Sequence, residues 1–222
     1  MSNFLGDVYE PVRASALLSG GEIMEREGME LGRSMVFRDL EDRISVFLVL
    51  PREGVFSDSW DERHHAYVFR GHDSVTVESG REKDQLAMYE SGRLSENGKF
   101  YKAAIAHREG SRKDPLQVQI YEKVASGVWY DKGIFNLVDA VQESEAGRRI
   151  FSFTLSPANL SRITDDAHHA ERMLSATEKA AIWEQCRGRC VRCGAQEGLR
   201  FIPGTHTLEC AVCRGEHIGL LG

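Results

Sequence analysis

The stretch Cys190-Val191-Arg192-Cys193, followed after sixteen residues by Cys210-Ala211-Val212-Cys213, decides how the C-terminal part of this chain folds. Each Cys-x-x-Cys turn, or zinc knuckle, places two thiolates close together, and zinc prefers four soft ligands in a tetrahedron. Two such knuckles supply all four ligands. We therefore predict that Cys190, Cys193, Cys210 and Cys213 bind one structural Zn²⁺ and hold a small module together.

A fifth cysteine, Cys186, precedes the first knuckle. Because two complete knuckles already satisfy a tetrahedral zinc ion, we interpret Cys186 as a spare thiol, with a competing zinc ligand as the alternative. Cysteines at metal spacing are typical of proteins in a reducing compartment. The first residues also lack the basic and apolar parts of a signal peptide. We therefore expect a cytoplasmic protein.

The composition is that of a soluble globular protein. The chain has 222 residues, of which 41% are hydrophobic and 28% charged, enough for one sizeable domain and a small one. The longest apolar run, Ile44–Leu50, has the length of a strand and is too short to cross a membrane. We therefore expect no membrane partner.

Arginines gather around the cysteines although the whole chain has a net charge of −6. The negative total argues against a protein that coats nucleic acid nonspecifically, but a local basic face remains compatible with it. Two interpretations stay open, a DNA-binding patch that contacts phosphates and an ordinary solvated surface. The arginines concerned are Arg187, Arg189, Arg192, Arg200 and Arg214.

Residues 1–157 have the pattern of a strand-rich domain with one or two helices. Apolar, β-branched and aromatic runs predict strands at 43–50, 66–70, 116–121, 133–140 and 149–155. Helical spacing predicts a helix at 97–107 and a second, short amphipathic one at 177–185. Between them, residues 158–175 have the polar composition of a linker, in which we interpret His168 and His169 as exposed residues.

Several short motifs, taken in order, resemble the SET-and-RING-associated (SRA) domain of bacterial modification-dependent restriction proteins. They are Gly6-Asp7-Val8-Tyr9, Tyr67-Val68-Phe69-Arg70-Gly71-His72-Asp73, Asp84-Gln85, Glu96-Asn97-Gly98-Lys99-Phe100 and Tyr130-Asp131-Lys132-Gly133. Phe69 stands where the family usually has Tyr, and the last motif carries one residue more than the family's Tyr-Asp-Gly. The resemblance implies an SRA/PUA-like twisted β-barrel.

SRA domains take a modified base out of the duplex and hold it in a pocket, which requires an aromatic stacking face and polar groups for the base edge. The resemblance implies that Phe69 stacks on the base and that Asp61 accepts a hydrogen bond from a cytosine amino group. The alternative is that the aromatic residues belong to the core and the acids to an ordinary loop. The implied pocket residues are Asp58, Trp60, Asp61, Phe69, Arg70, His72 and Asp73.

Residues 182–194 are similar to the opening of a bacterial HNH endonuclease module. They contain a helix that ends near Trp183, followed by Gly-Arg-Cys-x-x-Cys-Gly, and the second knuckle stands where that module has its own. An SRA-like domain followed by an HNH module is a recurrent bacterial architecture. The resemblance implies restriction of modified DNA, with hydrolysis assisted by Mg²⁺ or Mn²⁺, and a possible homodimer because enzymes that cut both strands often pair.

The catalytic residues of an HNH nuclease are not at their usual places. A general-base His normally follows the strand after the first knuckle, but here Leu199–Ile202 runs directly into Pro203-Gly204, and no Asn follows Asn159. The remaining candidates are His206 as the base and His217 as a metal ligand, with surface positions as the alternative. Nine residues follow Cys213, which is short for the helix that normally carries the last ligand.

The sequence therefore predicts an α+β protein that binds double-stranded, modified DNA. We expect an SRA-like domain at 1–157, a linker at 158–175, and an HNH-like four-cysteine zinc ribbon of the ββα-metal type at 176–222. The first function is a modification-dependent endonuclease, although enzymatic activity stays open. The alternatives are an inactive reader of modified DNA with a structural zinc ribbon, and a zinc-ribbon adaptor that docks another protein.

Overall fold

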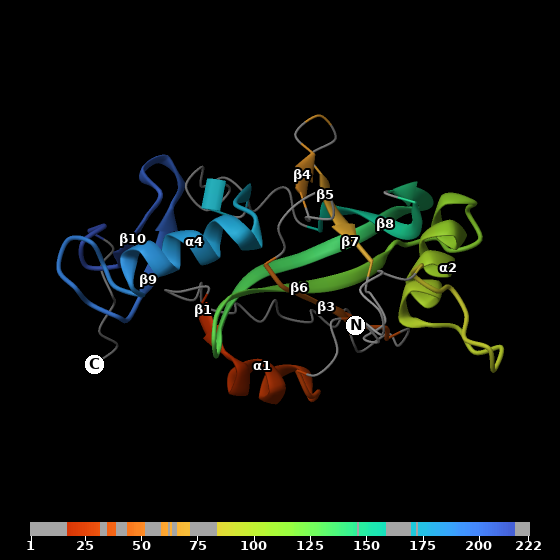
Figure 1. The fold of residues 1–222 in the computed structure, drawn as a ribbon, viewed down its shortest axis with the longest axis horizontal. Coiled ribbons are helices and arrows are strands. Elements are labelled where there is room, and N and C mark those ends of the chain that lie inside the picture. The colour runs from red at the N-terminus through yellow and green to blue at the C-terminus, as the bar shows by residue number, and fades with distance from the viewer. Residues whose placement is uncertain are drawn as a thin grey trace, which may run out of the picture.

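Ten strands and three α-helices make up the described part of the chain, whose coordinates are a computed structural model (Figure 1). The structure describes residues 17–31, 35–38, 44–51, 59–61, 63, 66–71, 84–145, 147–158, 170–171 and 173–215. The helices are α1 (Gly20–Glu27), α2 (Glu96–Arg108) and α4 (Ala176–Cys186). None of the described helices is both long and apolar enough to span a membrane.

Eight strands form one mixed sheet in the order β2-β3-β6-β7-β8-β5-β4, with β1 paired to β7. Strands β3 and β6 run parallel, and the other neighbours run antiparallel. The strands are β1 (Leu17–Ser19), β2 (Met35–Val36), β3 (Ser45–Val49), β4 (Ser59–Asp61), β5 (Ala66–Arg70), β6 (Leu116–Ala125), β7 (Val128–Glu145) and β8 (Arg148–Pro157).

The predicted twisted β-barrel is not closed among the described residues, whose strands form a mixed sheet. The hydrogen-bonded order ends at β2 on one side and at β4 on the other, so the sheet is open there. These two edge strands have only two and three residues, whereas β7 has eighteen. A curved, open mixed sheet with few helices is the architecture observed. The five predicted strands of this region are confirmed, and β6 and β7 are longer than predicted.

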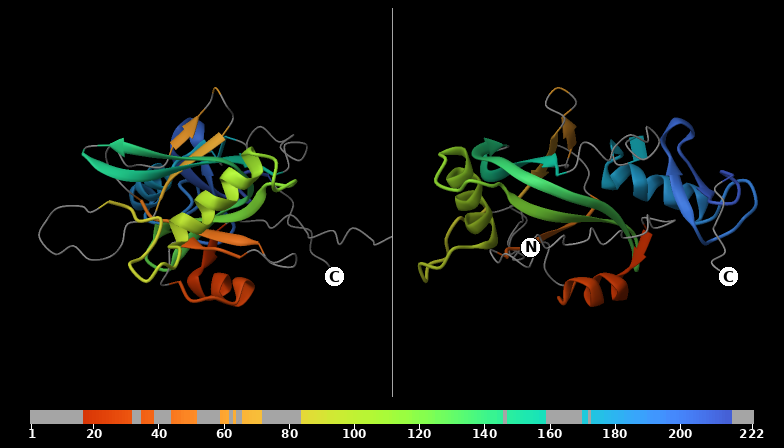
Figure 2. Two further views of the ribbon diagram at one scale, coloured as in Figure 1. Left: turned by 90° about the vertical axis from the view of Figure 1, so that its right-hand side faces the viewer. Right: turned by 180° about the vertical axis from the view of Figure 1, so that it is seen from behind.

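Both faces of β3 are covered, because side chains alternate between the two faces of a strand. Phe47 and Val49 belong to a core that includes Phe100 of α2, while Val46 and Leu48 pack in a second cluster with Ile23 of α1. All five residues of β3 are buried as a result. The two helices therefore lie on opposite sides of the sheet, as the turned views in Figure 2 show.

A β-bulge interrupts the pairing of β6 with β7. Ile120 faces Gly133 and Tyr121 faces Asp131, so Lys132 has no partner on β6, and Gly133 adopts a φ of +97° that suits glycine. Lys132 is the residue by which this sequence exceeds the Tyr-Asp-Gly pattern. The bulge turns its side chain into the junction with α4.

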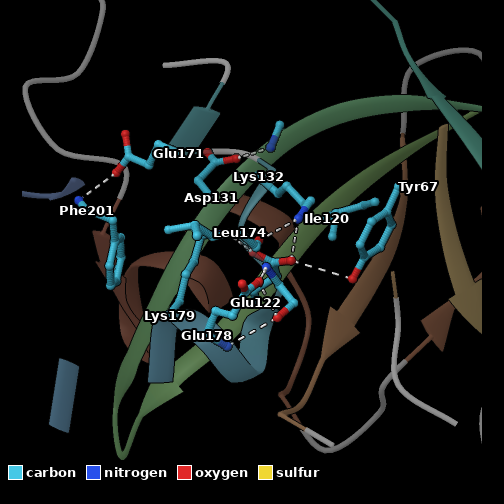
Figure 3. Close-up of polar contacts among 12 residues, drawn as sticks. Tyr67, Ile120, Glu122, Asp131, Lys132, Glu171, Leu174, Glu178, Lys179 and Phe201 are labelled. Atoms are coloured by element: carbon cyan, nitrogen blue, oxygen red, sulfur yellow. Dashed lines mark hydrogen bonds and ion pairs between the residues drawn. The ribbon is translucent and has the colours of Figure 1, made fainter. Parts of the chain in front are cut away.

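At this junction one carboxylate holds two lysines in a fully buried cluster (Figure 3). Glu122 of β6 accepts hydrogen bonds from Lys132 Nζ of β7 and Lys179 Nζ of α4, both at 2.6 Å. Both lysines also donate to the carbonyl of Leu174, at 3.3 and 2.5 Å. The ammonium groups lie 4.3 Å from the ring centres of Tyr67 and Tyr130, respectively. We call these three charged residues the junction cluster.

The small C-terminal hairpin packs on the same end of the sheet. Strands β9 (Leu199–Ile202) and β10 (Thr207–Cys210) pair antiparallel and are joined by the 3₁₀ turn Pro203–Thr205. Leu199 and Phe201 share a hydrophobic cluster with Ile182 of α4 and with Val124 and Tyr130 of the long sheet. The hairpin and the large sheet thus have a continuous core, and the helix predicted at 177–185 is confirmed as the element between them.

Candidate functional site

The four knuckle cysteines lie together at the end of the β9–β10 hairpin. One ligand atom from each of Cys190, Cys193, Cys210 and Cys213 lies within 4.8 Å of the others. The sulfurs of Cys193 and Cys210 are 3.5 Å apart. Zinc–sulfur bonds of about 2.3 Å in a tetrahedron separate neighbouring sulfurs by roughly 3.8 Å. The cluster therefore has the size needed for a metal such as zinc.

Each knuckle is a tight turn that its own backbone closes. The N–H of Gly194 donates to the carbonyl of Cys190 at 2.8 Å, and the N–H of Arg214 donates to the carbonyl of Cys210 at 3.1 Å. Gly194 has a φ of +79°, a conformation that glycine adopts without steric cost. The first knuckle is also joined to β10, because Val191 N–H donates to the carbonyl of Leu208 at 3.0 Å.

The thiols of the cluster favour a cation among them. Burial raises the pKa of Cys190, but backbone N–H groups directed at its sulfur bring that pKa down to about 6. The hydrogen bond with Cys193 and burial raise the pKa of Cys213 to about 12, and repulsion by the charge of Cys190 adds to this rise. A divalent cation removes this repulsion and lets all four sulfurs coordinate as thiolates. The donor set therefore fits zinc.

The fifth cysteine lies apart from this group. Cys186, the last residue of α4, is half-buried against the cluster of Ile182 and Leu199. It is not a member of the four-cysteine group. Its position agrees with the interpretation as a spare thiol. Next to it, a Cβ on Gly188 would lie 2.6 Å from the Trp183 ring, so the Trp and the Gly of the HNH-like motif are in direct packing contact.

Three of the five predicted arginines lie on the exposed surface of the zinc module. Arg187 caps the end of α4, Arg189 donates to the carbonyl of Gly194 at 3.4 Å, and Arg192 donates to the carbonyl of Cys213. Arg214 is half-buried and donates to the carbonyls of Glu209 and Gly198. The hydrogen bonds of Arg192 and Arg214 thus stabilise the knuckles. The side chains of Arg187 and Arg189 lie at the surface.

Arg200 lies in the interior, apart from the exposed arginines with which the sequence grouped it. Arg200 is buried, and its Nε and Nη2 donate to one oxygen of Glu171 at 3.0 and 2.9 Å. The other carboxylate oxygen of Glu171 accepts from the N–H of Phe201 at 3.0 Å. Glu171 is itself 1% exposed, although it belongs to the segment predicted as a polar linker. This pair fastens that segment to β9.

Phe69 lies in the core and does not fit the predicted stacking role. It is 3% exposed, and its ring stacks on Phe47 with the centres 4.4 Å apart. The alternation along β5 explains this position, because Tyr67 and Phe69 face the core while Val68 and Arg70 face outward. The core alternative that the sequence left open is therefore the observed one for Phe69.

Of the other residues implied for the base pocket, three lie in the described part of the chain and three lie outside it. Trp60 and Asp61 lie half-buried on β4, opposite Tyr67 and Ala66 of β5. Arg70 ends β5 and forms an ion pair with Glu143 of β7. The other three candidates, Asp58, His72 and Asp73, lie outside the described residues.

The structure brings three of the SRA-like motifs together at the end of β5. Gly71 N–H donates to the carbonyl of Phe151 at 2.8 Å, and Gln85 Nε2 donates to the carbonyl of Gly71 at 2.5 Å. Gln85 Oε1 in turn accepts from Phe151 N–H at 2.7 Å. A Cβ on Gly71 would lie 2.5 Å from Gln85 Oε1 and 2.7 Å from Asn97 Oδ1. A side chain at this position would therefore displace Gln85 and Asn97 from this arrangement, which we call the β5 clamp.

The clamp holds both ends of the segment that carries His72 and Asp73. Gly71 precedes that segment and Asp84 follows it, and both are bonded to β8, since Asp84 accepts from the N–H of Arg149 at 2.8 Å. Sequence reasoning used these motifs only as signs of a family. The sequence does not reveal the hydrogen bonds among Gly71, Gln85 and Phe151, because these residues are far apart in the chain and meet only in the folded sheet.

The predicted catalytic residue His206 does not belong to a metal-binding group among the described residues. His206 lies exposed at the tip of the β9–β10 hairpin, with a φ of +52° at the end of the 3₁₀ turn. Among the described residues, the four cysteines are the only set of three or more potential ligands that converge. His217 lies outside the described residues, as does the first motif, Gly6–Tyr9.

Comparison with known proteins gives structural neighbours only. No family model matches the chain, and no curated protein matches it. The SRA domain of SUVH5 bound to fully hydroxymethylated CG DNA is similar with a TM-score of 0.42 and 13% identity, over 62% of this chain and 82% of that one. These neighbours are SRA domains. Another SUVH5 SRA structure, with fully methylated CG DNA, gives a TM-score of 0.41 at 13% identity over 70% of this chain and 94% of that one.

KRYPTONITE in complex with mCHG DNA and SAH is a further similar structure. Its TM-score is 0.40 at 12% identity, over 64% of this chain and 31% of that chain. The similar structures of SUVH5 and KRYPTONITE are thus described as complexes with methylated or hydroxymethylated DNA.

Proposed function

We propose that this protein is a reader of double-stranded DNA that carries a modified base, and that its zinc module contacts the phosphate backbone beside the base. The β5 clamp is the observation that carries the proposal. It joins three separate motifs of the SRA resemblance into one contact, and it fixes both ends of the segment with His72 and Asp73 to β8. The SUVH5 structures contain the ligand class that we propose for this chain.

The stacking residue of the proposed pocket is Trp60. Phe69 is committed to the core, whereas Trp60 is only partly buried and lies on β4 beside β5. Trp60 packs against that core, and we propose that the exposed part of its indole ring stacks on the base, with Asp61, His72 and Asp73 as polar partners of the base edge. Free cysteines suit a reducing compartment, and we propose the cytoplasm as the location.

For the four-cysteine module we favour DNA binding without cleavage over hydrolysis of the phosphodiester. His206 lies at an exposed hairpin tip, and the described residues bring no carboxylate or second histidine to it as a metal-binding group. An HNH nuclease needs a base and a metal within reach of one phosphate. The four cysteines would fill all four positions of a tetrahedral structural ion and leave no open coordination position for catalysis.

Trp60→Ala is expected to weaken binding to DNA with a modified cytosine. Base–aromatic stacking contributes about 1–3 kcal/mol per base, so we expect an affinity loss of about 5- to 150-fold. Trp60→Phe retains an aromatic face and is expected to keep most of the affinity. The measurement is a mobility shift with matched duplexes that carry cytosine, 5-methylcytosine or 5-hydroxymethylcytosine, with Mg²⁺ and Mn²⁺ lanes that reveal any cleavage.

Tyr89→Ala is the control for this experiment, because Tyr89 is an exposed aromatic residue outside β4 and β5. Thermal melting of each variant separates lost binding from lost folding. Equal affinity for all three duplexes would contradict the proposal. Cleavage of only the modified duplexes would show that the protein is an endonuclease and not an inactive reader. Absence of DNA binding at low salt would favour the adaptor that docks another protein.

Arg189→Ala is expected to reduce the salt dependence of DNA binding. Each neutralised phosphate contributes about −0.9 to the slope of log K against log salt, so the slope should become shallower by about one. Arg108→Ala on α2 removes the same charge from the opposite end of the molecule and is expected to leave the slope unchanged (Figure 1). Equal slopes for Arg189→Ala and the wild type would exclude a phosphate contact at Arg189.

A further inference from the structure

A cavity on the α1 side of the sheet lies on the face opposite the Phe47–Phe100 core. Its volume is about 480 Å³, and it lies between the C-terminal end of α1 and strands β6 and β7. Its lining includes Glu25, Arg26, Glu27, Arg38, Gln119 and Ile134. Neither the zinc cluster nor the proposed base pocket contributes any of these side chains.

Gln119 presents an acceptor with no partner at this cavity. It is 3% exposed, and its Nε2 donates to Asp131 Oδ1 at 2.6 Å and to the carbonyl of Ile120 at 3.3 Å. Asp131 also accepts from Gly133 N–H at 2.9 Å, so the amide nitrogen of Gln119 must face the carboxylate. Within the described part of the chain, Gln119 Oε1 is left without a donor.

The cations that line the cavity are already paired. Arg26 Nη1 bonds to Asp131 at 2.8 Å, and Arg38 bonds to the Glu27 carboxylate at 3.1 Å and to the Glu27 carbonyl at 2.6 Å. Tyr121 also donates to Glu27, at 2.7 Å; burial and this hydrogen bond raise the pKa of Tyr121, which keeps the hydroxyl protonated. These guanidinium groups are therefore held away from an incoming anion.

The charge that remains at the cavity is negative. Two carboxylates, of Glu25 and Glu27, and two guanidinium groups, of Arg26 and Arg38, belong to the lining. Arg26 pairs with Asp131, which lies outside the lining, and Arg38 pairs with Glu27, so the described ion pairs leave the charge of Glu25 unbalanced. Glu25 is exposed at the cavity and has no ion pair among the described residues. The C-terminal end of a helix also carries partial negative charge, and α1 ends here at Glu27.

We propose that this cavity binds a small organic cation with several N–H groups, of the amine or guanidinium class. Gln119 Oε1 accepts one N–H in the interior, and Glu25 balances the positive charge at the opening. Both groups offer acceptors only in this arrangement, and a cationic donor satisfies them together. The proposal is independent of DNA binding, since its residues lie outside both proposed DNA contacts.

Isothermal titration of the 222-residue chain with agmatine, which carries both a guanidinium and an amine, tests this site. We expect saturable 1:1 binding that weakens as salt is added, because the attraction is electrostatic. Gln119→Met keeps the length of the side chain but removes the acceptor, and we expect it to weaken binding by about 10- to 100-fold. Glu25→Gln should weaken it several-fold and should not disturb the fold, because Glu25 is exposed.

Gln117→Met is the matched control. Gln117 lies on the same face of β6, two residues away, but it is exposed and does not line the cavity. We expect it to bind agmatine as the wild type does. Thermal melting reports whether Gln119→Met folds. If that variant does not fold, Glu25→Gln still tests the site.

Three results would overturn the proposal: no agmatine binding tighter than about 10 mM, binding that Gln119→Met and Glu25→Gln leave unchanged, or preference for succinate over agmatine. A Gly-Arg-Gly peptide presents the same guanidinium on a chain. Tighter binding of the peptide than of agmatine identifies the source as an arginine of a partner protein, and the reverse identifies a free small molecule.

Discussion

Glu122→Gln is expected to lower the free energy of unfolding by about 3–5 kcal/mol, because it removes one partner of a buried ion pair and leaves the other charges unpaired. Both lysines of the junction cluster depend on this carboxylate, with Nζ–O distances of 2.6 Å. The side chains of Glu122 and Lys179 are fully buried and that of Lys132 is 1% exposed, so water cannot replace the lost carboxylate. Denaturant unfolding followed by circular dichroism measures the effect.

Lys179→Met provides the contrast. It removes one of two cations that share a single carboxylate, and Lys132 still pairs with Glu122. Replacement of a buried ion by an apolar side chain of similar size is often neutral or stabilising. We therefore expect a change smaller than that of Glu122→Gln. If both variants lose the same stability, the charge balance of the cluster is not what holds the junction.

The pH dependence of the cluster follows from the same burial. Desolvation lowers the pKa of Lys179 to about 8 against its ordinary value of 10.5. Between these two values the unfolded chain binds more protons than the folded one, so the stability of the wild type rises with pH relative to Lys179→Met. Burial raises the pKa of Glu122, but the two lysines lower it more, to below 4.5. Its contribution is lost as pH falls through that lowered pKa.

Removal of zinc is the second large effect that we expect. Structural zinc sites contribute apparent free energies of about 10–16 kcal/mol, which is more than the small core around Leu199, Phe201 and Leu208 could supply. Treatment with a strong chelator should therefore unfold the β9–β10 hairpin. Metal analysis should give one zinc per chain before treatment, and the fluorescence of Trp183, which packs on Gly188, should report the unfolding.

Cys193→Ser and Cys186→Ser separate the site from its neighbour. Cys193 belongs to the converging group, so its substitution should abolish stable zinc binding. Cys186 stands outside that group, and its substitution should leave the zinc content at one per chain. Zinc retained by Cys193→Ser but lost from Cys186→Ser would reassign the fourth ligand.

The local part of this architecture could be predicted from the sequence. The cysteine spacing correctly indicated a four-cysteine cluster, because each knuckle is formed by neighbouring residues. The apolar runs located the strands for the same reason, and the helix that begins at Glu96 has its N-cap in Ser95, whose hydroxyl accepts from Gly98 N–H. The alternation of Tyr67 and Phe69 along β5 was also a usable sign that Phe69 faces the core.

The long-range part could not be predicted. Glu122 and Lys179 are 57 residues apart, and Glu171 and Arg200 are 29 residues apart, so no sequence pattern pairs them. In the sequence, nothing distinguishes Arg200 from the exposed arginines around the cysteines. Its burial depends on the ion pair with Glu171, which forms only in the folded protein. The open edges of the sheet depend on strands of two and three residues, which are too short to show a periodic pattern.

The junction cluster also decides which piece of this chain could be exchanged for another. A cut in the segment before α4 would separate Lys179 from Glu122 and Lys132, although the sequence there looks like a natural boundary. A zinc module transplanted onto a different sheet would bring a buried cation without its anion. The sheet left behind would keep a pair that is electrically balanced but open to water on one side. The modular unit of this protein is therefore the helix together with the bulged strand pair that receives it.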